Sequence, residues 1–141
     1  MRVLGLDLGS KTLGMAISDK LGLIASTYKT IFFNEGCYDE LLVPIKEIIE
    51  NEHIETIVLG LPKNMNNSMG PRAMETLAFK EKVESFLNHE IILEDERWTS
   101  VQANNLLIKA DMSRKKRKKT VDKLAATFIL QSYLDKNRKE N

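Results

Sequence analysis

The chain opens with an apolar segment that contains one carboxylate. Residues 2–8 read Arg-Val-Leu-Gly-Leu-Asp-Leu, which predicts a strand buried on both faces. Asp7 is the exception, and Gly9 and Ser10 then let the chain turn back. A buried carboxylate costs several kcal/mol unless its charge is compensated, and a bound cation is a common compensation. The segment therefore indicates phosphate chemistry through a metal ion, although an Asp that caps the turn also fits the pattern.

Length and composition limit the class of protein. The 141 residues suit one domain with its own core, and 43% hydrophobic and 29% charged residues are ordinary for a globular protein. The single cysteine, Cys37, excludes an internal disulfide or a cysteine zinc cluster. No signal-peptide pattern is visible, and no apolar stretch approaches the roughly 20 residues that a membrane span needs. We therefore expect one cytoplasmic domain over residues 1–141 and no membrane partner.

The net charge of +1 hides an uneven distribution of charge. Six of the 21 basic residues form one run, which leaves 15 basic against 20 acidic side chains in the rest of the chain. The run consists of Arg114, Lys115, Lys116, Arg117, Lys118 and Lys119. Such a block on an acidic body either binds a polyanion locally or is a solvated linker. We place it in a connecting segment over about 111–119.

Hydrophobic periodicity predicts a three-strand meander followed by alternating strands and helices, which is an α/β pattern. The expected strands are 2–8, 12–18, about 23–31, 56–60 and 90–95. The expected helices are about 38–52, 72–87, 99–110 and 120–137. A polar, Asn-rich loop over 63–70 fits either a flap over a ligand or plain surface, and a short polar tail ends the chain.

A second candidate carboxylate lies in the last predicted helix. Asp122 precedes Ala125, Ala126 and Ile129 by three, four and seven residues, so it shares the stripe that faces the core. The small alanines allow a close approach of this helix to the sheet. An acid in a first helical turn is also favoured by the helix dipole, so a purely structural role fits Asp122 as well.

A third acidic position ends the fifth strand, at Asp95 and Glu96. Ligand sites in open α/β sheets lie at the carboxyl ends of strands, where Asp7 also lies. The exact register is open, so either acid could join Asp7. Three carboxylates without clustered His or Cys suit Mg²⁺ or Mn²⁺. Two such ions about 4 Å apart can activate water and stabilise the leaving oxygen of a phosphodiester.

Nearly the whole chain, about residues 2–134, resembles the YqgF/RuvX family of RNase H-like nucleases. The motifs are Gly5-Leu-Asp7-Leu-Gly9 with Gly14-Met-Ala-Ile-Ser-Asp19, Gly60-Leu-Pro62 with Gly70, Asp95-Glu-Arg97, and Asp122-Lys-Leu-Ala-Ala126 with Ile129-Leu-Gln131. The resemblance implies a ribonuclease H-like fold: a mixed five-stranded sheet, its first three strands an antiparallel meander, flanked by helices. It also implies a metal-dependent endonuclease that processes the 5′ end of the 16S rRNA precursor, with Holliday-junction resolution as the alternative.

The resemblance further implies the roles of individual residues. Asp7, Glu96 and Asp122 are the expected catalytic acids and ligands of two Mg²⁺ or Mn²⁺ ions, with Asp95 as the alternative to Glu96. The basic run becomes a binding surface for phosphates that flank the site. Lys11, Arg72 and Arg97 are weaker candidates for the same task. Lys11 stands where many members of the family carry arginine, which keeps the charge but loses bidentate phosphate binding.

Two other classes of function stay open at this point. An ATP-binding domain of the actin, sugar-kinase and chaperone type opens with a similar strand and hairpin, but it needs two domains and a second glycine-rich phosphate loop. A non-catalytic RNA-binding or ribosome-assembly factor could use the same scaffold. The expected partners are precursor rRNA or branched DNA and the small ribosomal subunit, and both a monomer and a homodimer are compatible with the sequence.

Overall fold

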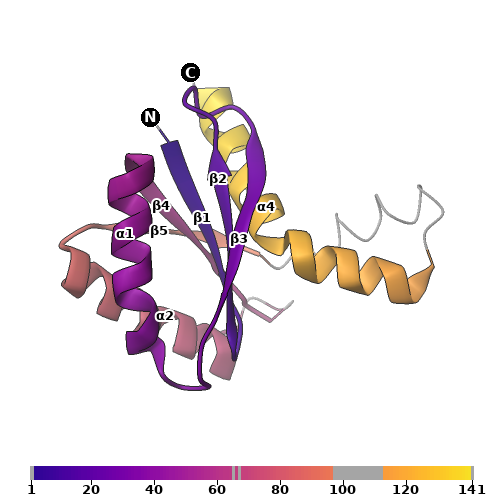
Figure 1. Cartoon of the computed structure of the whole chain (residues 1–141). Coiled ribbons are helices and arrows are strands. Elements are labelled where there is room, and N and C mark those ends of the chain that lie inside the picture. Colours follow the sequence, from indigo (N-terminus) through magenta and orange to yellow (C-terminus); the bar gives the residue numbers. More distant parts are fainter. Residues whose placement is uncertain (1, 65, 67, 97–112, 141) are drawn as a thin grey trace.

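The computed structural model describes residues 2–64, 66, 68–96 and 113–140 (Figure 1). The elements of this part are β1 (Arg2–Leu8), β2 (Thr12–Ser18), β3 (Ala25–Phe32), the 3₁₀ helix η1 (Tyr38–Leu41), α1 (Leu42–Glu52), β4 (Ile54–Leu61), α2 (Pro71–Leu87), β5 (Ile91–Asp95) and α4 (Arg114–Glu140). The helix expected over 99–110 lies outside the described residues. None of the described helices is both long and apolar enough to cross a membrane.

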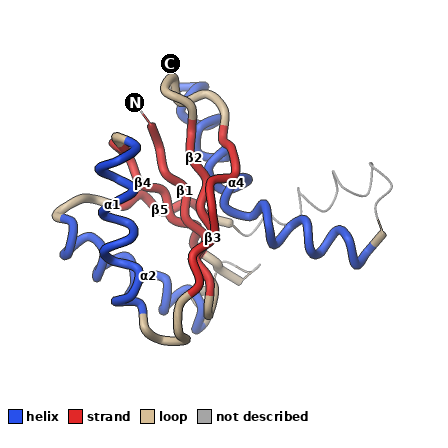
Figure 2. The backbone as a smooth tube through the Cα atoms, viewed as in Figure 1, coloured by secondary structure: helices blue, strands red, loops and turns tan. Residues whose placement is uncertain are grey.

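The strands form one mixed sheet in the order β3-β2-β1-β4-β5 (Figure 2). β1 pairs antiparallel with β2, and β2 pairs antiparallel with β3. β4 lies parallel to both β1 and β5. The α/β class and the antiparallel meander of the first three strands are therefore confirmed. Because β1, β4 and β5 run in the same direction, their carboxyl ends meet at one edge of the sheet.

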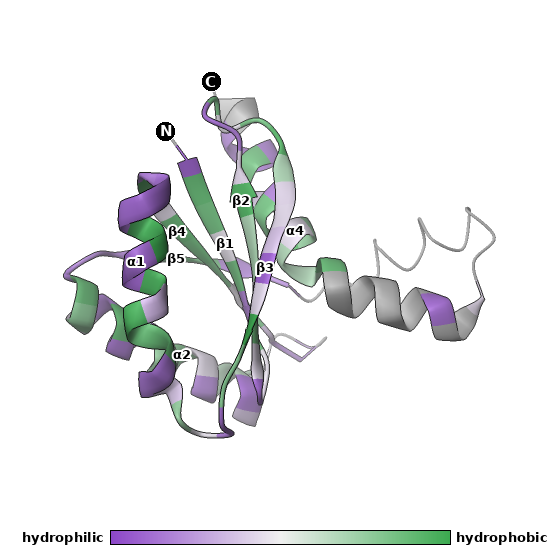
Figure 3. Cartoon of the chain, viewed as in Figure 1, coloured by the Kyte–Doolittle hydropathy of each residue, from purple (hydrophilic) through white to green (hydrophobic). Residues whose placement is uncertain are grey.

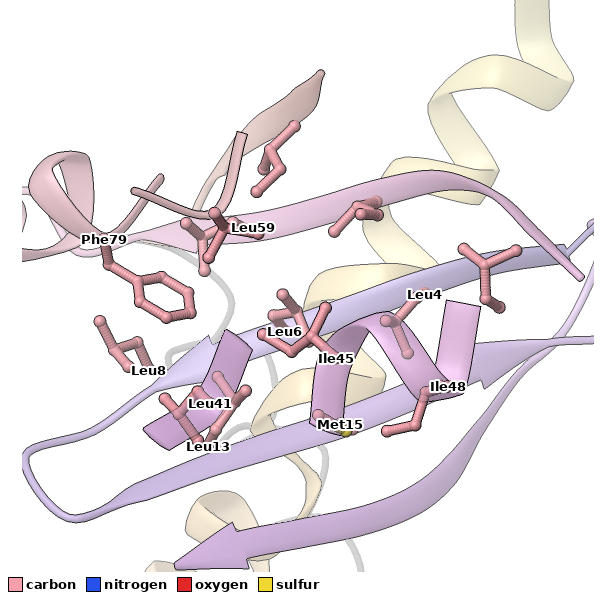
Figure 4. Packing of buried hydrophobic residues seen from close by; sticks show 14 of the residues in the cluster. Leu4, Leu6, Leu8, Leu13, Met15, Leu41, Ile45, Ile48, Leu59 and Phe79 are labelled. Carbon is pink, nitrogen blue, oxygen red and sulfur yellow. The ribbon is translucent and has the colours of Figure 1, made fainter. Parts of the chain in front are cut away.

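Helices cover both faces of the sheet (Figures 1 and 3). The larger core lies between the sheet and the helices α1 and α2, and Figure 4 shows Leu6, Ile45 and Phe79 among its side chains. The smaller core lies under α4, where Ile129 and Leu130 are almost fully buried. The hydrophobic residues of the central strands thus face helices on both sides, as the apolar sequence of the first strand predicts.

Successive residues of β1 alternate between these two cores. Leu4, Leu6 and Leu8 belong to the larger core, and Val3 belongs to the core under α4. Gly5 faces α4 as well, because a Cβ built on it would lie 2.7 Å from the Cβ of Leu130. By the same alternation Asp7 projects on the α4 side. Glycine at position 5 is therefore what allows α4 to lie close to the strand that carries Asp7.

Several boundaries differ from the sequence-based expectation, among them those of β4, which covers Ile54–Leu61 rather than 56–60. β3 covers Ala25–Phe32 rather than 23–31, and the helix expected over 38–52 begins with a 3₁₀ turn before α1. Pro44 lies in the first turn of α1, where its missing N–H is tolerated.

A larger difference concerns the basic run. α4 begins at Arg114, so the predicted start of the last helix at about 120 is wrong and residues 114–119, expected in a connecting segment, are helical. The side chain of Ser113 caps the helix, since its Oγ accepts a hydrogen bond from the backbone N–H of Lys116 at 3.3 Å. Lys and Arg are good helix formers, so the run can be helical. Because it contains no apolar residue, it shows no hydrophobic period from which a helix could be predicted.

Candidate active site

Asp7 and Glu96 lie on the same face of the sheet, at the carboxyl ends of β1 and β5, the two strands that flank β4. In β5 the side chain of Glu94 reaches α4, where its Oε2 accepts hydrogen bonds from Ser132 Oγ at 2.9 Å and Lys136 Nζ at 2.7 Å. Alternation then turns Asp95 to the opposite side and returns Glu96 to the α4 side. The geometry therefore favours Glu96 over Asp95 as the acid that accompanies Asp7.

Glu96 lies over Gly60 of β4. A Cβ built on Gly60 would lie 2.5 Å from Glu96 Oε2 and 2.5 Å from Ile129 Cδ1 of α4. The backbone N–H of Glu96 donates to the carbonyl of Leu61 at 3.2 Å, which holds the chain beside β4 after β5 has ended. The absence of a side chain at position 60 thus leaves the space that the Glu96 carboxylate occupies.

The surroundings of Glu96 oppose its negative charge. Burial and, to a smaller extent, the neighbouring carboxylate of Asp7 raise the pKa of Glu96 to about 7, and Asp95 makes a minor contribution in the same direction. The guanidinium of Arg72 opposes this shift. The fold therefore brings two carboxylates together in a partly dry place, an arrangement that a hard divalent cation would stabilise.

Arg72 belongs to this site. It is the second residue of α2, and its Nη2 donates a hydrogen bond to the carbonyl oxygen of Leu8 at 2.9 Å. The bond fixes the guanidinium beside the end of β1, directly after Asp7. Arg72 was predicted only as a weak contact for nucleic acid; the structure adds a fixed position and an electrostatic effect on Glu96. Pro71 indicated from the sequence where α2 begins, but nothing in the sequence indicated the hydrogen bond from Arg72 to Leu8.

The third predicted acid lies on α4. Ala126 packs against the sheet, 3.9 Å from the position of a Cβ on Gly14, which is paired with Asp7. Asp122 precedes Ala126 by one helical turn, so the backbone of α4 carries it toward the edge where β1 ends. The side chain of Asp122 lies outside the described part, and so does the whole of Arg97. Within the described residues, no three His, Cys, Asp or Glu side chains form a metal-binding group.

The other predicted basic residues lie in the turn after β1 and at the start of α4. Lys11 is exposed in the turn between β1 and β2, and its carbonyl accepts a hydrogen bond from the N–H of Phe33 at 2.9 Å. The run 114–119 forms the first turns of α4, which extend away from the sheet, and Lys116 is exposed (Figure 1). Cations at a helix N-terminus repel one another and oppose the helix dipole, an arrangement that bound phosphates would relieve.

Sequence analysis gave Gly60 no role of its own, and the crowding around it predicts a measurable effect. In Gly60→Ala the new Cβ must displace both Glu96 and Ile129, so we expect the free energy of unfolding to fall by about 1–3 kcal/mol. Gly14→Ala is the matched control, because a Cβ there meets its nearest atoms at 3.9 Å. Urea unfolding compares the two variants, and equal stabilities would contradict the close fit at Gly60.

The sheet order, the helices on both faces and the paired carboxylates define an RNase H-like α/β domain. The fold superposes on that of Thermus thermophilus RuvC in a complex with a Holliday junction substrate, with a TM-score of 0.65 and 12% identity. The superposition covers 100% of this chain and 97% of that chain. At this level of identity the similarity concerns the fold.

The family follows from the sequence comparisons. A family model described as "RuvX: Holliday junction resolvase" matches residues 1–136. A Geobacillus sp. (strain WCH70) protein with the curated name "Putative pre-16S rRNA nuclease" is 51% identical over 135 residues, which are 96% of this chain and 98% of that protein. A Bacillus subtilis (strain 168) protein of the same name is 50% identical with the same coverage. The chain therefore belongs to the RuvX family, and its curated relatives bear the name of a nuclease.

Proposed function

We propose that this chain is a metal-dependent endonuclease that hydrolyses phosphodiester bonds of structured nucleic acid in the cytoplasm. The observation that carries the proposal is the position of Asp7 and Glu96, side by side on one sheet face, with the pKa of Glu96 raised to about 7 by burial and by Asp7.

The residues fit Mg²⁺ or Mn²⁺ as the resident ions. All the candidate ligands are carboxylates: Asp7 and Glu96, with Asp122 from α4 as the third. Two such ions, when bound, would activate water and stabilise the leaving oxygen. Asp95 leaves β5 on the opposite side, so we assign it no ligand role.

The chain's own side chains orient the substrate around these acids. Arg72 is fixed to the carbonyl of Leu8 and adds positive potential next to Glu96, which favours a phosphate at this edge. Lys11 and the basic first turns of α4 contact phosphates on either side of the cleaved bond. Phosphate contacts of this kind position the strand without reading its sequence.

For the substrate we favour the 5′ end of the 16S rRNA precursor, on the small ribosomal subunit or its precursor. The curated names of the relatives that are half identical to this chain support RNA. Branched DNA is the second candidate, supported by the description of the family model and by the fold neighbour bound to a Holliday junction. We propose a monomer or a homodimer as the active form.

A side-by-side assay tests this proposal. Purified protein is incubated with a labelled 16S precursor fragment and with a four-way DNA junction, each with Mg²⁺, with Mn²⁺ and with EDTA. We expect cleavage of the RNA with either cation and none in EDTA. Cleavage of the junction alone would select the second substrate. Binding without cleavage of either substrate would support a non-catalytic assembly factor.

The basic start of α4 predicts a change in salt dependence. Replacing Lys115, Lys116, Lys118 and Lys119 together by alanine should weaken nucleic-acid binding. The slope of log K against log salt should become less steep by about 3, because each lost phosphate contact reduces its magnitude by about 0.7–0.9. Fluorescence anisotropy from 50 to 300 mM KCl gives the slope. Lys46→Ala with Lys82→Ala, on α1 and α2, is the control. An unchanged slope in the variant with four alanines would mean that the basic run has a structural role and does not bind phosphates.

A further inference from the structure

A large aromatic side chain lies exposed at the end of the sheet where Asp7 lies. Phe32, the last residue of β3, is 78% exposed. Asp7 pairs with Gly14 on β2, which in turn pairs with Thr30 on β3. Phe32 follows Thr30 by two residues, and paired or alternate residues share a face. Phe32 therefore projects on the same side of the sheet as Asp7.

The backbone at Phe32 is held in place, whereas the ring of Phe32 is not used by the fold. The next residue, Phe33, is buried in the larger core, and its N–H donates to the carbonyl of Lys11 at 2.9 Å. These contacts fix the end of β3 against the turn between β1 and β2. Among the residues that the structure describes, the ring of Phe32 stacks on neither an aromatic ring nor a cation. Its exposed area thus remains available to a ligand.

The surroundings of Phe32 suit a nucleotide. Its partner across the strands is Thr12, and the exposed Lys11 precedes Thr12 in the chain. An exposed cation in the turn beside the end of β3, together with the exposed ring of Phe32, offers the two groups that a nucleotide requires, one for its phosphate and one for its flat base. Asp7 is two strands and two residues away, roughly 12 Å at standard strand dimensions. A stacked strand covers that distance in about three or four nucleotides.

We propose that Phe32 and Lys11 bind one unpaired nucleotide of the substrate, with its base stacked on the Phe32 ring and its phosphate at Lys11. The inference rests on the proposed nuclease function and adds a substrate class to it: nucleic acid that is single-stranded a few nucleotides from the cleaved bond. Because every base has a flat face, this contact selects unpaired strands rather than a particular base.

Binding to two matched RNAs tests the proposal. One is a labelled hairpin with a blunt end, and the other is the same hairpin with a single-stranded 5′ extension that contains 2-aminopurine. Affinities are measured by anisotropy without divalent cations, so that cleavage does not interfere. We expect Phe32→Ala to weaken binding of the extended RNA about 10-fold and to leave the blunt hairpin unchanged. Phe32→Trp should keep the affinity, and Phe86→Ala on α2 is the aromatic control.

The fluorescence of 2-aminopurine reports stacking directly. It should fall when wild-type protein binds the extended RNA, and this quenching should be lost in Phe32→Ala. If Phe32→Ala matches the wild type in affinity and quenching while the wild type cleaves RNA, the stacking role is wrong and the nuclease function stands. If the wild type neither binds nor cleaves these RNAs or the four-way DNA junction, both proposals fail. If the variant instead turns a dimer into a monomer by light scattering, with RNA affinity unchanged, the ring contacts a second copy and the stacking role is overturned.

Discussion

Asp7→Asn and Glu96→Gln should each lower the rate of metal-dependent cleavage about 1000-fold or more while the protein stays folded. Both substitutions keep the size of the side chain and remove a negative charge, so they weaken the hold on a cation that is expected to supply several kcal/mol of transition-state stabilisation. Single-turnover cleavage of the labelled 16S precursor fragment measures the rates. Circular dichroism and thermal unfolding verify that each variant is folded.

Asp95→Asn is the control that distinguishes the two neighbouring acids. Asp95 leaves β5 on the face opposite to Asp7, so its loss should change the rate only a few-fold. A large effect of Asp95→Asn with little effect of Glu96→Gln would contradict the assignment of the faces. Glu94→Gln adds a second comparison, because Glu94 is bound to Ser132 and Lys136 and is expected to affect stability rather than cleavage.

The sequence predicted most of the sheet because its strands carry strong local signals. The apolar run around Asp7, the Gly9-Ser10 turn and the short strand before Leu61 each stand out from the flanking polar residues. The antiparallel meander of the first three strands was predicted from their short turns, whereas the position of β4 and β5 beside β1 comes from the structure. The start of α4 was misplaced because the basic run has no apolar residue to reveal its period, whereas its cap at Ser113 became visible only with the structure.

The candidate site was predicted less completely, because its geometry depends on the contacts between elements. Choosing between Asp95 and Glu96 requires the register of β5, and a shift of one residue reverses the face of every side chain. The fit of Glu96 over Gly60 and the bond from Arg72 to Leu8 join residues that are far apart in the sequence. No periodicity within a single segment contains that information.

The raised pKa of Glu96 predicts how stability depends on pH in the protein without metal. Its carboxyl titrates near 4.5 in the unfolded chain and at about 7 in the folded one, so the folded state binds the extra proton between these values. Stability from this group is fully present below about pH 4.5 and is lost as pH rises through 7. The loss reaches about 3 kcal/mol at pH 8, as an upper limit for a partly buried group.

Glu96→Gln isolates this effect, because glutamine has no proton to lose. In EDTA, the stability of the variant should exceed that of the wild type at pH 8 and match it more closely at pH 5, as measured by urea unfolding. The lowered pKa values of Asp19 and Glu84 affect both proteins alike and cancel in the comparison. Parallel curves from pH 5 to pH 8 would contradict the raised pKa.

Addition of Mg²⁺ should restore the stability that the wild type lacks at pH 8 relative to Glu96→Gln, since a cation favours the charged carboxylate that burial opposes. We expect 10 mM Mg²⁺ to raise the melting temperature of the wild type by several degrees at pH 8 and by less at pH 5, where protons compete with the ion for Glu96. Asp7→Asn and Glu96→Gln should lose most of this shift. Equal shifts in all three proteins would place the bound ion away from these two carboxylates, whatever the outcome of the cleavage assay. The metal site and the nuclease activity are therefore tested by separate measurements.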